Sequence, residues 1–127
     1  MPVSVNIDPT RKLVVTTAFG FVSDAEFLQA RSNLLADPLF DPSYDRLWDF
    51  SAVTEEKVSE QTLAYLVDTS PAAGLILRAV VVCMPPVPFQ RVLDFICESR
   101  RFSRQIAAFP LRKMAEDWIL SERAKAA

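Results

Sequence analysis

Two spacings of hydrophobic residues alternate along the chain, and each predicts a kind of secondary structure. Apolar residues at every second position are typical of a strand with one buried face, and intervals of three and four are typical of a helix. An unbroken β-branched run within residues 77–84 predicts a central strand that is buried on both faces. Gly20 is expected to end the second strand, and residues 51–56 are expected to form a loop. The five expected strands cover residues 3–7, 12–19, 46–50, 77–84 and 104–108.

Helical spacing predicts four helices, over about 23–36, over about 58–68, after residue 88 and from about residue 111. Ser23 and Glu26 have the spacing of a capping box at the start of the first helix. The second helix is expected to bury Val58 and Tyr65. The last helix places Met114 and Trp118 on its apolar stripe, so both are expected to be buried. Residues 122–127 are expected to fray.

The expected order is ββαβαβαβα in a single domain over residues 1–127. A hairpin followed by strand–helix pairs predicts an α/β fold: a five-stranded, mainly parallel sheet with one antiparallel outer strand and four helices. Right-handed crossovers between strands laid in order place every helix on one face of the sheet. The second strand has Leu13, Val15 and Phe19 on one face and Val14 and Ala18 on the other, so whichever face the helices leave open carries apolar residues that need a cover. Either a symmetric homodimer or a helix that crosses to the far face would supply it.

Composition removes several classes of function. The 127 residues carry a net charge of −2, so nucleic-acid binding, which needs clustered cations, is not expected. Histidine is absent, and there is no glycine-rich loop, so no catalytic triad, metal site, cofactor or nucleotide phosphate site is predicted. The chain is therefore not expected to be an enzyme. A cytoplasmic protein is favoured, because the two cysteines are far apart and no leader pattern is visible. Membrane insertion is not expected, because the apolar runs are far shorter than the ~20 residues of a membrane helix.

Candidate binding residues gather at the carboxyl ends of two expected strands, the edge at which open α/β sheets bind ligands. Asp49 and Ser51 follow the third strand, and a local hydrogen bond between hydroxyl and backbone is the structural alternative. Thr54 and Ser59 are candidates that helix capping would equally explain. Asp41, Asp45 and Asp49 are not expected to lie on one common face, so a solvated loop is favoured over a metal site.

A second candidate segment contains three prolines between residues 85 and 88. Pro85 and Phe89 could form a rigid apolar rim beside the Ser51 loop, or the prolines could only stiffen a crossover connection.

One stretch, Trp48-Asp49-Phe50-Ser51-Ala52-Val53-Thr54, resembles the strand–loop of the STAS domain, whose bacterial type is the anti-sigma-factor antagonist. Gly20, the strand Arg78 to Val82, Arg91 and Trp118 extend the resemblance to the SpoIIAA-like group, which is related to Sec14-like domains. Counting from Asp49 places Ser59 at the serine that antagonists have phosphorylated. Lys57 and Glu60 replace the aspartate and glycine of that motif, so the standard phosphoserine switch is not expected.

The resemblance implies two functions. The first is a non-enzymatic regulatory domain that presents the third-strand loop, with Asp49, Ser51 and Thr54, and the second helix, next to Ser59, to an unknown protein partner. Arg91 is a further candidate for binding a partner or a ligand. The alternative is a module that binds a lipid or another apolar small molecule, as the Sec14-like side of the resemblance implies.

Overall fold

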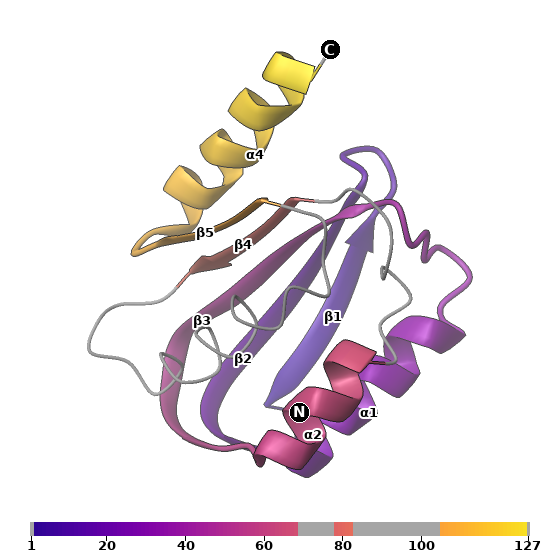
Figure 1. Cartoon of the computed structure of the whole chain (residues 1–127), viewed down its shortest axis with the longest axis vertical. Helices are drawn as coiled ribbons and strands as arrows, with labels where there is room; N and C mark the ends of the chain where they lie inside the picture. Colours follow the sequence, from indigo (N-terminus) through magenta and orange to yellow (C-terminus); the bar gives the residue numbers. More distant parts are fainter. Residues whose placement is uncertain (1, 69–77, 83–104, 127) are drawn as a thin grey trace.

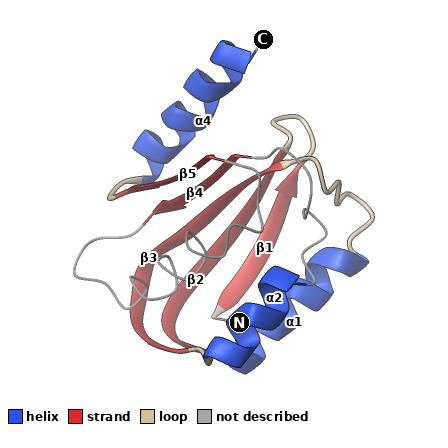
Figure 2. Ribbon diagram, in the orientation of Figure 1, coloured by secondary structure: helices blue, strands red, loops and turns tan. Residues whose placement is uncertain are grey.

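Five strands form one mixed sheet with helices on both faces in the computed structural model, which describes residues 2–68, 78–82 and 105–126 (Figures 1 and 2). The elements are β1 (Val3–Asp8), β2 (Leu13–Ser23), α1 (Asp24–Ala36), β3 (Asp45–Lys57), α2 (Glu60–Asp68), β4 (Arg78–Val82), β5 (Gln105–Phe109) and α4 (Arg112–Ala126). The strands lie in the order β1-β2-β3-β4-β5, with β1 antiparallel to β2 and the other neighbours parallel. The predicted α/β class is confirmed. The helix expected after residue 88 lies outside the described residues.

Strands β2 and β3 are longer than their sequence pattern predicts. Gly20 does not end β2: it takes a positive φ of +67°, which glycine tolerates, and the strand continues to Ser23. Residues 51–56, expected as a loop, belong to β3. The two strands stay paired through two register shifts, at which β3 has one residue more than β2. The pairing is made by backbone groups, so exposed polar side chains in this part of β3 do not end it.

The core has a layer on each face of the sheet. Helices α1 and α2 cover one face, where Ala30 of α1 and Leu63 of α2 pack with Ala18 and Val22 of β2. Helix α4 lies on the opposite side (Figures 1 and 2). A helix on the far face was one of the two expected covers for the second apolar surface, and the structure contains it. The homodimer stays a prediction.

The second layer joins α4 to the sheet. Ala115 and Ile119 of α4 pack with Leu13, Leu47 and Val80, from three neighbouring strands. The strand alternation explains both layers, because consecutive residues of β2 point to opposite faces. Trp118 is half-buried against Phe109, with ring centroids 6.3 Å apart. The prediction that Met114 is buried was wrong. Met114 is 43% exposed, although its neighbour Ala115 is fully buried.

Helix ends differ from the sequence prediction in two places. Ser23 stands at the N-cap of α1, but its hydroxyl donates to the Glu26 carboxylate at 2.5 Å and makes no cap bond to the backbone. Val58 is buried just before α2, and Tyr65, expected inside, is 54% exposed. The predicted fraying after residue 121 is also wrong for the part described, because α4 continues to Ala126.

Candidate functional site

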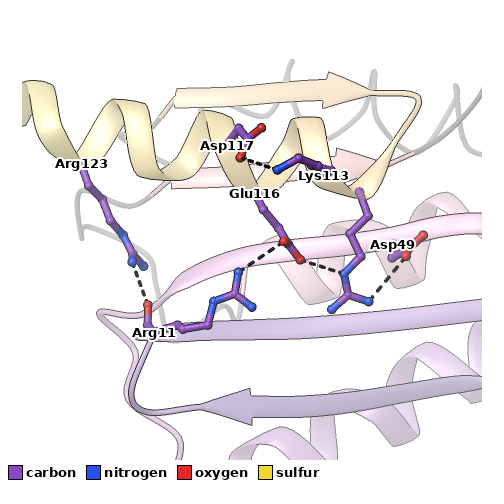
Figure 3. Close-up of polar contacts among 7 residues, drawn as sticks. Arg11, Asp49, Lys113, Glu116, Asp117 and Arg123 are labelled. Carbon is purple, nitrogen blue, oxygen red and sulfur yellow. Dashed lines mark hydrogen bonds and ion pairs between the residues drawn. The ribbon is translucent and has the colours of Figure 1, made fainter.

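Asp49 and Ser51 form a local turn within β3. One Asp49 carboxylate oxygen accepts hydrogen bonds from the backbone N–H of Ser51 at 3.1 Å and from its hydroxyl at 2.6 Å. The other oxygen lies 3.8 Å from the Arg112 guanidinium at the start of α4 (Figure 3). The turn coincides with the first register shift between β2 and β3. These contacts give both residues a structural role, in shaping the strand and in placing α4.

Further ion pairs continue along the same side of α4 (Figure 3). Glu116 lies 3.1 Å from Arg112 and 3.6 Å from Arg11. At the other end of the helix, Arg123 donates to the buried Asp45 carboxylate at 2.8 Å and to the carbonyl oxygens of residues 11 and 12 at 2.8 and 3.0 Å. Helix α4 therefore runs along the segment of β3 between Asp45 and Asp49, with an arginine at each end.

Asp45 and Asp49 share this face of the sheet, which corrects the expectation that the Asp41, Asp45 and Asp49 set has no common face. Each of the two pairs with a different arginine of α4. Asp41 lies in a separate exposed turn, where hydrogen bonds from the backbone N–H and hydroxyl of Ser43 lower the pKa of its carboxyl group. Within residues 2–68, 78–82 and 105–126, no three potential metal-ligating side chains come together.

Ser59 is the N-cap of α2. Its hydroxyl accepts the backbone N–H of Thr62 at 3.1 Å and donates to the Asp24 carboxylate at 2.9 Å, while its own N–H donates to the same carboxylate at 2.7 Å. Ser59 therefore joins the starts of α1 and α2 and is half-buried there. The capping explanation is correct for Ser59. It is wrong for Thr54, which lies exposed inside β3 and begins no helix.

The structure does not bring the predicted residues into one site. Asp49 lies beside α4, whereas Ser59 lies beside Asp24 at the opposite end of β3. The eight residue steps of β3 from Asp49 to Lys57 span about 26 Å at the usual rise of ~3.3 Å. Three further candidates, Pro85, Phe89 and Arg91, lie outside the described residues.

Sequence reasoning missed an exposed aromatic pair on β2. Phe19 and Phe21 follow Leu13 and Val15 at every second position, so they face the same side of the sheet, yet they are 52% and 46% exposed. Helix α4 begins beside Asp49 and runs away from this part of the sheet. Ala52, also exposed, is the β3 neighbour of Phe19. We call Phe19, Phe21 and Ala52 the Phe19 patch, and Ser51 and Thr54 of β3 are exposed next to it in sequence.

Comparison with known proteins identifies the fold. No family model and no curated protein matches the sequence. Among solved structures, the chain is similar to an uncharacterized protein of the DUF3478 family, which has a SpoIIAA-like fold and comes from Shewanella loihica PV-4. The TM-score is 0.60 at 13% sequence identity, over 92% of this chain and 93% of that one. The chain thus has the SpoIIAA-like α/β fold that its STAS resemblance implied.

The described helices include none that is both long and apolar enough to cross a membrane.

Proposed function

We propose that this chain is a non-enzymatic, cytoplasmic interaction domain with a regulatory role, and that the Phe19 patch is its contact surface for another protein. The observation that carries the proposal is the exposure of Phe19 and Phe21, at 52% and 46%, on a strand whose other large apolar residues are buried. Aromatic side chains are enriched where proteins bind one another, because they bury a large area with few rotatable bonds.

The backbone beneath Phe19 is already hydrogen-bonded on both sides. Strand β2 pairs with β3 along its length and with β1 from Leu13 to Ala18, and the N–H of Phe19 donates to the carbonyl oxygen of Pro2 at 2.9 Å. Strand addition by a partner could begin only beyond Phe19, so at Phe19 itself recognition depends on apolar side chains that the partner brings. The hydroxyls of Ser51 and Thr54 can supply the polar rim that surrounds the apolar centre of most interfaces.

Regulation through Ser59 is not part of the proposal. Its hydroxyl is hydrogen-bonded to Asp24, and a phosphate there would stand beside a carboxylate. A non-enzymatic role is supported by the lack of histidine in the sequence and by the hydrogen bond that joins the Ser51 hydroxyl to the Asp49 carboxylate.

Site-directed photo-crosslinking in the native host tests the proposal. A photoreactive phenylalanine analogue replaces Phe19, and a matched control variant carries it at Leu35 of α1, which is 54% exposed. We expect one discrete crosslinked protein at position 19 that is absent at position 35. A product of twice the chain mass would identify a second copy as the partner.

Equal crosslinking at both positions, or none at position 19, would contradict the proposal. Native mass spectrometry of the purified protein separates the alternative, because a co-purifying apolar molecule that is lost with Phe19→Ser would favour a small-molecule module.

A further inference from the structure

Arg46 is a charged residue in the middle of the sheet. It lies on β3, the central strand, beside Val14 of β2 and Ala79 of β4. Its guanidinium carbon is 5.0 Å from the ring centroid of Phe40, which packs with Leu34 of α1. Arg46 therefore lies on the face that α1 covers, away from α4, and only 7% of the residue is exposed.

The guanidinium has two buried donors that nothing described accepts. Nε and Nη2 of Arg46 are both buried, and no acceptor from residues 2–68, 78–82 or 105–126 forms a hydrogen bond with either. Buried donors without a partner are rare, because each loses its hydrogen bonds to water without replacement. The N–H groups of Nε and Nη2 are parallel on one edge of the guanidinium. This edge matches two oxygens of a carboxylate or phosphate group.

The surrounding charges also favour an anion. Burial lowers the pKa of Arg46 to about 10, and repulsion from the Arg31 charge on α1 adds to this shift. Arg31 itself donates to the carbonyl oxygen of Leu66 at 2.8 Å. The neighbouring carboxylate in β3, that of Asp45, does not neutralise the Arg46 charge. Asp45 faces the opposite side of the sheet and is hydrogen-bonded to Arg123 there.

We propose that the Nε–Nη2 edge of Arg46 is an anion-binding site that takes one oxyanion group, a carboxylate or a phosphate. Two oxygens of the anion accept the two orphaned N–H groups, and its charge offsets that of Arg46 and Arg31. The guanidinium carbon lies over the Phe40 ring, 5.0 Å from its centroid, and the Nε–Nη2 edge is the part of the guanidinium without a described acceptor. The donors are buried, so the anion enters through a local opening of the structure. The site is independent of the Phe19 patch, which lies on the other face.

Thermal melting with different anions tests the proposal. The purified protein in chloride buffer is titrated at constant ionic strength with acetate, octanoate or inorganic phosphate. We expect a saturable rise in Tm with at least one of them, of about 3–5 °C at roughly four times its Kd. A larger effect of octanoate than of acetate would indicate the carboxylate of an amphiphile, and an effect of phosphate alone would indicate a phosphate ligand.

Two variants and one direct measurement decide the outcome. Arg46→Met should lose the anion response, and Arg11→Met, which removes the same charge from an exposed ion pair, should keep it. Should Arg46→Met fail to fold, the Nε–H resonances of ¹⁵N-labelled wild-type protein give the answer, because one buried arginine proton should shift downfield with the anion. A Tm that stays the same when each oxyanion replaces chloride, the same Tm rise in Arg46→Met, or unmoved arginine resonances would overturn the proposal.

Discussion

Shortening Ile119 to alanine measures how strongly α4 is held on the second face of the sheet. Ile119 is 3% exposed and packs in a cluster with Leu47, Val80 and Ala115, each of them 0% exposed. The change removes three carbon atoms, about 2.4 kcal/mol of transfer free energy at ~0.8 kcal/mol per methylene. The strands beneath are fixed by their backbone pairing, so the cavity closes only in part. We therefore expect a total loss of about 3–4 kcal/mol.

Equilibrium unfolding in urea, followed by tryptophan fluorescence and far-ultraviolet circular dichroism, measures this loss. With a slope of roughly 2 kcal/mol per molar urea, the midpoint should fall by about 1.5–2 M. The matched control is Leu120→Ala, one residue further along the same helix and 58% exposed, which should cost less than about 0.5 kcal/mol. Equal losses in the two variants, or a loss below about 1 kcal/mol for Ile119→Ala, would refute the placement of α4 against the sheet.

Three further predictions concern polar groups. Asp45→Asn removes a buried carboxylate from Arg123, which keeps its two carbonyl partners, so the free energy of unfolding should fall by about 1–3 kcal/mol in a urea melt. Arg46→Met should raise the free energy of unfolding by about 1–4 kcal/mol in buffer without oxyanions, because it removes a buried charge. Burial holds the folded-state pKa of Arg46 at about 10, below the ordinary value of an arginine, so the cost of the buried charge is present in full below pH 10 and fades as the pH rises above it. The stability gap between Arg46→Met and wild type should therefore be constant from about pH 6 to 9 and narrow above pH 10. Ser59→Asp places a second carboxylate beside Asp24 and should cost about 1–3 kcal/mol, measured in the same way.

Each of these has a control on the same chain. Asp117→Asn, in an exposed ion pair with Lys113 at 3.6 Å, should change the free energy of unfolding by less than about 0.5 kcal/mol. An equal effect at Asp45 would show that the Arg123 pair is not buried in solution. A destabilised Arg46→Met would mean that the guanidinium is satisfied in the folded protein. Thr54→Asp, at an exposed strand position, should leave the free energy of unfolding nearly unchanged. If Ser59→Asp were equally harmless, the hydrogen bond between Ser59 and Asp24 would be contradicted.

Local patterns predicted the kind of each element that the structure describes. Val14 and Val15 are both apolar, although consecutive strand residues face opposite sides, and this alone required a cover on each face of the sheet. The stretch from Trp48 to Thr54, together with the element order and positions such as Gly20 and Trp118, carried the resemblance that the fold comparison supports. These features are local, because alternation and helical spacing depend only on residues a few positions apart.

Predictions failed where a distant backbone or helix decides the environment. The polar residues after Phe50 were expected in a loop, but their backbone pairs with β2, and pairing of this kind leaves no periodic apolar signature. Phe19 lies on the same face of β2 as Leu13 and Val15, and the sequence pattern cannot show that this residue is exposed whereas the other two are buried. It is exposed because α4 begins at Arg112 and does not reach it.

The sequence by itself therefore determined the α/β class, the presence of apolar residues on both faces of the strands, and the lack of histidine chemistry. The tertiary structure decided which helix covers the second face, which part of that face stays open, and what Asp45, Asp49 and Ser59 contact. Asp45 meets Arg123 across 78 residues of chain, and Ser59 meets Asp24 across 35. Arg46 is buried, with its guanidinium over Phe40, and two of its nitrogens have no described acceptor. Such contacts depend on how whole elements pack, and no short-range spacing of residues encodes them.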